Sequence, residues 1–210
     1  MKLQHSNEAV EPTYITIVAT EPGYQRLFEL AGKIGGLLKS ALIKSDPNLA
    51  APLDDLLGSV YSLILAKQHG FANRMNRPVD LAPVAQRAGQ MAKGRIRVNG
   101  KWIAGFYFNN ALFRTAAVYH RALKTIVGKR NGYVPELLPK LKKEFPNWIG
   151  TNIAKVHDQV NELKHAPRGV HDKRTVTSDI AVAAIDELVA LIERYVKKHE
   201  PSRKADPGRK

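Results

Sequence analysis

Apolar residues recur every three or four positions over long stretches of this chain, and this spacing limits its fold more than any other feature. An α-helix turns once in about 3.6 residues, so such a pattern lines one side of a helix with apolar groups. Between residues 149 and 165 the apolar positions are Ile149, Ile153, Val156, Val160 and Leu163. Similar patterns and helix-breaking residues predict helices over 21–44, 52–69, 78–93, 104–127, 135–145 and 178–199, the last capped by Ser178 and Asp179. The expected fold class is mainly α, a helical bundle.

One short region departs from the helical pattern. Residues 95–103 alternate apolar and polar side chains around Asn99 and Gly100, a pair that is common in two-residue hairpin turns. The sequence therefore predicts a small β-hairpin near residues 95–103, and residues 14–18 are a candidate for a further short strand. We expect an N-terminal segment at 1–20, a single helical domain at 21–199 and a disordered basic tail at 200–210.

The formal net charge of +14 is the strongest global property of the chain. A basic surface attracts polyanions such as nucleic acid, although charge alone selects no sequence and no reaction. The absence of cysteine excludes disulfides, thiolate metal sites and a cysteine nucleophile. We find no run typical of a membrane span, and the polar first residues are not typical of a signal peptide. The expectation is a cytoplasmic protein with no membrane partner.

A row of polar side chains accompanies the apolar stripe of the predicted 149–165 helix. His157, Asn161 and His165 recur every four residues and therefore lie in line. Imidazole titrates near neutrality, so this row suits proton transfer or contact with phosphate. Further basic residues are Lys164 and, in the following loop, Arg168 and His171. The alternative interpretation is the solvated end of a packed helix, whose cations lie favourably against the helix dipole.

A second row lies on the predicted 104–127 helix. Asn110, Arg114 and Arg121 are four and seven residues apart, which places them within about 40° of one another around the axis. Arginines beside apolar neighbours must reach solvent, pair with an acid or face a cleft. The row is a candidate for substrate binding. The alternative explanation is ordinary ion pairs, for which the candidate acids are Asp158, Glu162 and Glu187.

Several other chemistries lack their motifs in this chain. His157 and His165 are eight residues apart without the carboxylate pattern of a helical metal site, so no metal is expected. We find no P-loop, no nucleophile elbow and no dinucleotide-binding glycine pattern, and therefore expect no cofactor. Gly32, Gly35 and Gly36 fall inside a predicted helix, where we expect them to permit close packing.

The segment VNELKH (160–165), on a late helix of a basic and mainly helical chain, resembles the signature helix of HEPN domains. That family's motif is an arginine followed after four to six residues by a histidine, often written Arg-Asn-x-x-x-His. Asn161 and His165 match its last two named positions, and Val160 occupies the place of the arginine. The preceding 104–127 helix also looks like a core helix of HEPN-like proteins, so the resemblance covers about residues 104–198.

The resemblance implies a homodimeric helical bundle that binds RNA. Many HEPN proteins are metal-independent endoribonucleases of toxin–antitoxin or phage-defence systems, which implies an antitoxin-like partner. For such an activity it implies His165 as general acid–base, Asn161 as an orienting group and Arg114 or Arg168 on the phosphate. Other members have lost the motif and serve as RNA-binding or protein-interaction modules. Asn110, Arg121, His157, Lys164 and His171 complete the candidate substrate-binding set.

Overall fold

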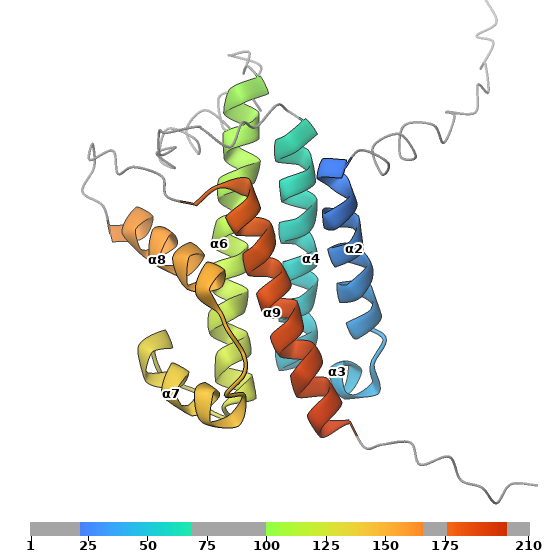
Figure 1. The fold of residues 1–210 in the computed structure, drawn as a ribbon, viewed down its shortest axis with the longest axis vertical. Helices are drawn as coiled ribbons and strands as arrows, with labels where there is room; N and C mark the ends of the chain where they lie inside the picture. The colour runs from blue at the N-terminus through green and yellow to red at the C-terminus, as the bar shows by residue number, and fades with distance from the viewer. Residues whose placement is uncertain (1–21, 69–99, 166–175, 201–210) are drawn as a thin grey trace, which may run out of the picture.

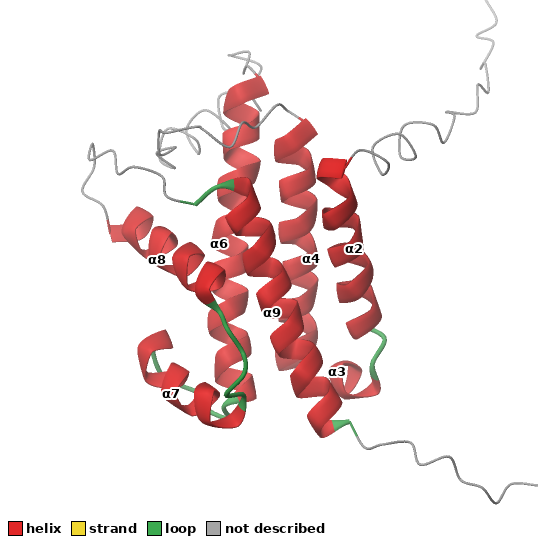
Figure 2. Ribbon diagram, viewed as in Figure 1, coloured by secondary structure: helices red, strands yellow, loops and turns green. Residues whose placement is uncertain are grey.

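The computed structural model describes residues 22–68, 100–165 and 176–200. These ranges hold helices and no strand (Figure 2), which confirms the mainly α fold class. In chain order the helices are α2 (Pro22–Leu37), α3 (Ala41–Ser45), α4 (Pro47–Gln68), α6 (Gly100–Ile126), α7 (Val134–Glu144), α8 (Thr151–His165) and α9 (Ser178–His199).

The long helices form a bundle in which α4 and α6 lie antiparallel. Asn48 of α4 contacts Thr125 near the end of α6, and Ser62 contacts Asn110 near its start. Figure 1 shows α9 crossing in front of α6 and α4, with α2 beside α4 and α8 on the other side of α6. The short α7 lies near the C-terminal end of α6. One side of the α4–α6 pair is therefore turned away from α9.

Most of the core comes from the apolar stripes that the sequence predicted, but the stripe predicted over 149–165 is buried only at its centre. Ile153, Val156 and Val160 are buried at 0–1% exposure, as the periodicity requires. Ile149 precedes α8 and is 73% exposed, so its assignment to the stripe is wrong. Helical spacing orients a side chain only where the backbone is helical, and α8 starts two residues later, at Thr151.

Local side-chain hydrogen bonds move two of the predicted helix boundaries. The single helix expected over 21–44 is interrupted after Leu37, because Ser40 adopts an extended backbone and its Oγ accepts a bond from the Ile43 amide to begin α3. Helix α9 is capped by Thr177, whose Oγ1 accepts from the Ile180 amide, in place of the expected Ser178. The Thr177 hydroxyl, one position before Ser178, thus serves as the N-cap.

The predicted β-hairpin near residues 95–103 is not supported. Residues 100–103 form the first turn of α6, so they cannot supply the second strand. An isolated two-stranded hairpin is only marginally stable, whereas a helical turn here extends a helix that is already anchored in the bundle. Residues 95–99, the candidate strand at 14–18 and the predicted helix at 78–93 lie outside the described residues.

Two further expectations change for α2 and α4. A Cβ added at Gly32, Gly35 or Gly36 would meet nothing within 4 Å, so these glycines do not serve close packing. Helix α4 is long and apolar enough to cross a membrane by length and composition, in contrast to the sequence-based expectation. More than half of its apolar window, 56%, is buried inside the bundle, as in a core helix.

Candidate nucleic-acid interface

The row of Asn110, Arg114 and Arg121 lies along the side of α6 that faces α4. Asn110 Nδ2 donates to Ser62 Oγ over 3.0 Å, and Ser62 Oγ donates in turn to the Gly58 carbonyl over 2.9 Å. Arg114 Nη1 lies 3.8 Å from Asp55 Oδ1, and Arg121 donates to the other oxygen of the same carboxylate. The acid that pairs with both arginines is therefore Asp55, and not Asp158, Glu162 or Glu187.

Both arginines remain accessible while they are paired. Their side chains are 44% and 46% exposed, and Asp55 is 38% exposed. One carboxylate serves two guanidinium groups, so this cluster keeps one positive charge in excess. Arg114 lies so close to α4 that a Cβ at Gly58 would approach its Nη1 to 2.4 Å. The absence of a side chain at Gly58 thus lets the Arg114 guanidinium rest on the α4 backbone.

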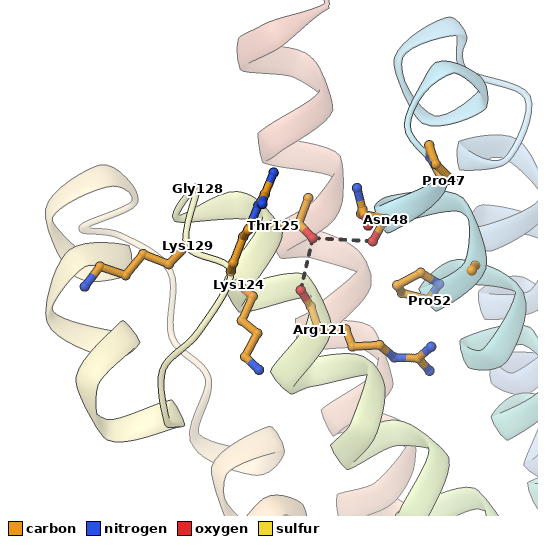
Figure 3. Close-up of a pocket in the computed structure, with 10 residues that line it drawn as sticks. Pro47, Asn48, Pro52, Arg121, Lys124, Thr125, Gly128 and Lys129 are labelled. Carbon is orange, nitrogen blue, oxygen red and sulfur yellow. Dashed lines mark hydrogen bonds between the residues drawn. The ribbon is translucent and has the colours of Figure 1, made fainter.

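A basic groove continues this row at the end of the bundle where α4 begins and α6 ends. It encloses about 660 Å³ and is lined by Pro47, Asn48, Ala51, Pro52, Arg121, Lys124, Thr125, Gly128, Lys129 and Arg130. Figure 3 shows Arg121, Lys124 and Thr125 on α6 opposite Pro47, Asn48 and Pro52 on α4. Four of these described lining residues are cationic and none is acidic. Such a groove attracts anions.

Two helix ends are tied together in the floor of the groove. Pro52 lacks an amide hydrogen, so the Asn48 carbonyl loses its usual helical donor four residues later. Thr125 Oγ1 lies 3.4 Å from this carbonyl oxygen and 3.1 Å from the Arg121 carbonyl oxygen (Figure 3). The hydroxyl has one hydrogen to share between the two carbonyls, and through it the end of α6 contacts the start of α4.

The turn after α6 places two cationic residues at the edge of the groove. Gly128 has a φ of +69°, the left-handed conformation that favours glycine at a helix end. The Gly128 amide donates to the Thr125 carbonyl and the Lys129 amide donates to the Lys124 carbonyl. These are the two bonds of a Schellman motif, which reverses the chain sharply. Lys129 and Arg130 consequently follow the helix end and line the groove with Arg121 and Lys124.

The histidine row occupies a different side of α6. His157 packs against the Tyr119 ring edge-on, with ring centroids 5.9 Å apart. Helical geometry places Tyr119 about 180° around α6 from Asn110. The Asn161 amide nitrogen lies 3.3 Å from the His157 ring nitrogens, so these two members of the row contact each other. The structure therefore does not bring the described part of the histidine row together with Arg114 or Arg121.

The end of α8 supplies only part of the remaining candidate set. Lys164 Nζ lies 5.9 Å from the centroid of the Phe113 ring of α6, a cation–π contact. His165 is the last residue of α8, and its side chain is outside the described part of the structure. Arg168 and His171 also lie outside it. In the described ranges no group of three histidines, aspartates or glutamates is arranged to hold a metal ion.

The helix that carries the histidine row is held by a residue that the sequence analysis assigned to another role. The Glu187 carboxylate of α9 accepts bonds from the amides of Asn152 and Ile153, each 2.9 Å long, and from the Asn152 side chain at 2.7 Å. It therefore caps the N-terminus of α8. Trp148 Nε1 donates to the Glu187 carbonyl over 2.9 Å. A helix cap that comes from another helix cannot be predicted from the residues next to the capped helix.

The groove was missed for a related reason. Arg121 was the only residue of its lining in the candidate set, because Lys124, Lys129 and Arg130 carry no motif. The basic segment after α6 was visible in the sequence, but its partner surface at Pro47–Pro52 comes from a distant segment. Comparison of the chain with protein-family models, curated proteins and solved structures finds no match.

Proposed function

We propose that this protein binds RNA on the side of the bundle formed by α4 and α6. The observation that carries the proposal is the continuous arrangement of Arg114 and Arg121 with the basic groove at the end of the same helix pair. An arginine has five donors in a planar fork, so one shared carboxylate leaves donors available to phosphate. The net charge of +14 favours encounter with any polyanion.

Binding is a better-supported activity than cleavage. The HEPN-like interpretation requires a cation near His165, and the arginines of α6 are paired with Asp55 on the α4 side of that helix. The amide of Asn161 is directed to His157, its neighbour one turn earlier. Both observations argue against cleavage that uses Arg114, and they leave RNA binding as the activity that the described residues support. The expected homodimer and antitoxin-like partner remain predictions, which sedimentation and co-purification would test.

The test compares two pairs of cations that have similar exposure. Arg114 and Arg121 share Asp55, whereas Arg26 and Lys33 of α2 share Asp186 of α9 and Arg26 also pairs with Glu29. All four side chains are 43–46% exposed. The double variant R114Q/R121Q and its control R26Q/K33Q therefore lose the same number of charges from equally exposed positions, and only the first pair carries a net positive charge beside its acid. A labelled single-stranded RNA of about 12 nucleotides is long enough to lie along both arginines and the groove.

We expect R114Q/R121Q to weaken RNA binding about tenfold and to make it less dependent on salt, because each lost phosphate contact removes one counterion release. R26Q/K33Q is expected to bind within about twofold of the wild type. Equal losses in both variants would reduce the proposal to a general effect of net charge. Binding that hardly changes between about 50 and 200 mM salt would instead favour a protein-interaction module.

A separate assay addresses cleavage. The same RNA is incubated with wild-type protein and with His165→Ala in EDTA, and its length is followed on a gel. The proposal expects intact RNA with both proteins. Cleavage by the wild type that is lost in His165→Ala would replace it with a metal-independent nuclease.

A further inference from the structure

The cations of the groove are less neutralised by acids than the two arginines in the middle of the α4–α6 side. Arg114 and Arg121 share an acid, but Lys124, Lys129 and Arg130 have no ion pair with a described residue. Positive charge therefore rises from the middle of α6 towards its C-terminal end. An RNA strand bound along this side would be attracted most strongly at the groove, at the end of the bundle.

A second observation shows that cations are crowded beside the groove. Contact with the Lys129 side chain is the main cause that lowers the pKa of Lys140, a residue of α7, and burial and charge repulsion act in the same direction. Figure 3 shows Lys129 extending from the turn towards α7. Two ammonium groups held close together repel each other, and an anion placed between or beside them relieves that repulsion.

The N-terminus of α4 adds no free amides to this site. Asn48 donates its amide to the Asp46 carboxylate over 2.9 Å, and the amides of Leu49 and Ala50 donate to the Asp46 carbonyl. The charge that attracts an anion into the groove therefore comes from its lysine and arginine side chains. The lysine ammonium groups act as point charges, which favour a highly charged ligand, and the arginines add directional donors to its oxygens.

We infer that the groove is a subsite for a phosphomonoester, which the terminal phosphate of a bound RNA strand would fill. This inference rests on the proposed function, because it places the strand along α4 and α6. A terminal phosphate carries about −1.5 to −2 charges at pH 7, compared with −1 for an internal diester. The volume of about 660 Å³ suits a group the size of one nucleotide. A free mononucleotide has the same chemistry.

The experiment measures the affinity of the full chain for one RNA sequence with a 5′-phosphate, a 3′-phosphate or hydroxyls at both ends. We expect one of the two phosphates to tighten binding about tenfold. The preference is expected to disappear in K124Q/K129Q, which removes two cations of the groove. The control is K142Q/K143Q, which removes two exposed lysines of α7 that do not line the groove and is expected to keep the preference. Circular dichroism checks that both variants are folded.

Lowering the pH provides a signature that a general loss of charge does not share. The preference for phosphate is expected to shrink from pH 7 to about pH 5, because the monoester loses its second charge near pH 6 while lysines stay protonated. Equal affinity of the wild type for all three RNAs would overturn the inference and leave RNA binding intact. Binding of adenosine monophosphate that needs Lys124 and Lys129, without any RNA binding, would support the groove and refute the proposed function. A phosphate preference retained in K124Q/K129Q would also overturn it.

Discussion

The two sides of α6 present different environments to their polar residues. On the α4 side, Arg114 and Arg121 share Asp55 and stay nearly half exposed. On the α8 side, Tyr119 is 1% exposed and packs between His157 and Trp148, with ring centroids 5.9 and 6.4 Å away. The comparison teaches that polar residues in line on a helix acquire a role from what covers them. The covered side stabilises the fold, and the open side is available to a ligand.

The largest change in stability is expected when the attachment of α8 to the bundle is weakened. Glu187→Ala removes the cap of α8 and leaves the amides of Asn152 and Ile153 without their carboxylate. We expect the free energy of unfolding to fall by about 2–3 kcal/mol, as for a charged cap with several hydrogen bonds. Urea unfolding measures it. Glu193→Ala, on the same helix, is the control and is expected to change stability by less than about 0.5 kcal/mol.

A pH titration tests how completely Tyr119 is enclosed. Burial, helped by the charges of Asp158 and Glu187, raises the pKa of Tyr119 above its usual value. An exposed tyrosine ionises near pH 10, so the unfolded chain releases this proton first and stability is lost as the pH rises above about 10. At pH 11 we expect the wild type to lose about 1 kcal/mol more than Tyr119→Phe, relative to pH 8. Equal losses would mean that the hydroxyl is accessible in the folded protein.

On the open side, the shared carboxylate is expected to limit RNA binding. Asp55→Asn releases both arginines and removes a negative charge, so RNA affinity is expected to rise about three- to fivefold at low salt. Asp186→Asn removes the same charge beside Arg26 and Lys33, where Glu29 stays paired with Arg26, and provides the reference for fluorescence anisotropy. A similar gain in both variants would remove the distinction between the α4–α6 side and the rest of the surface.

The smallest effect concerns the glycine under Arg114. Alanine in a helix is more stable than glycine by about 0.5–1 kcal/mol, and Gly32→Ala in α2 is expected to show this gain because its Cβ meets nothing within 4 Å. At Gly58 the new Cβ must displace the Arg114 guanidinium. We therefore expect Gly58→Ala to gain less, by about 0.5 kcal/mol, in thermal unfolding. Identical gains would show that Arg114 rests elsewhere.

The helices were predictable because their signal is local. Helix α6 starts within a few residues of the predicted boundary and ends one residue before it, and α9 matches the predicted range. The hairpin prediction was wrong because an Asn-Gly pair is compatible with a turn but does not require one. A glycine can equally well begin a helix, and the neighbouring apolar residues extend the helical pattern of α6.

The site was predictable only in part, because its partners come from distant segments. Spacing correctly grouped Asn110, Arg114 and Arg121 on one side of a helix, but it did not identify Asp55 as their acid. The same limitation affected Glu187, which was a candidate ion-pair partner and is a helix cap. Spacing specifies an angle around one axis, whereas a site depends on which second helix lies at that angle.

Pro52 has a consequence for how the groove receives a ligand. Because Pro52 leaves the Asn48 carbonyl without a helical donor, the Thr125 hydroxyl shares its single hydrogen between that carbonyl and the Arg121 carbonyl, and this contact connects the start of α4 to the end of α6. The backbone of the groove is therefore preorganised, and an arriving ligand orders only long side chains, at about 0.5–1.5 kcal/mol each. In Thr125→Val, which lacks the hydroxyl, part of the backbone would have to become ordered when the ligand binds. The effect of this substitution would appear as a slower association rate rather than as a lost contact.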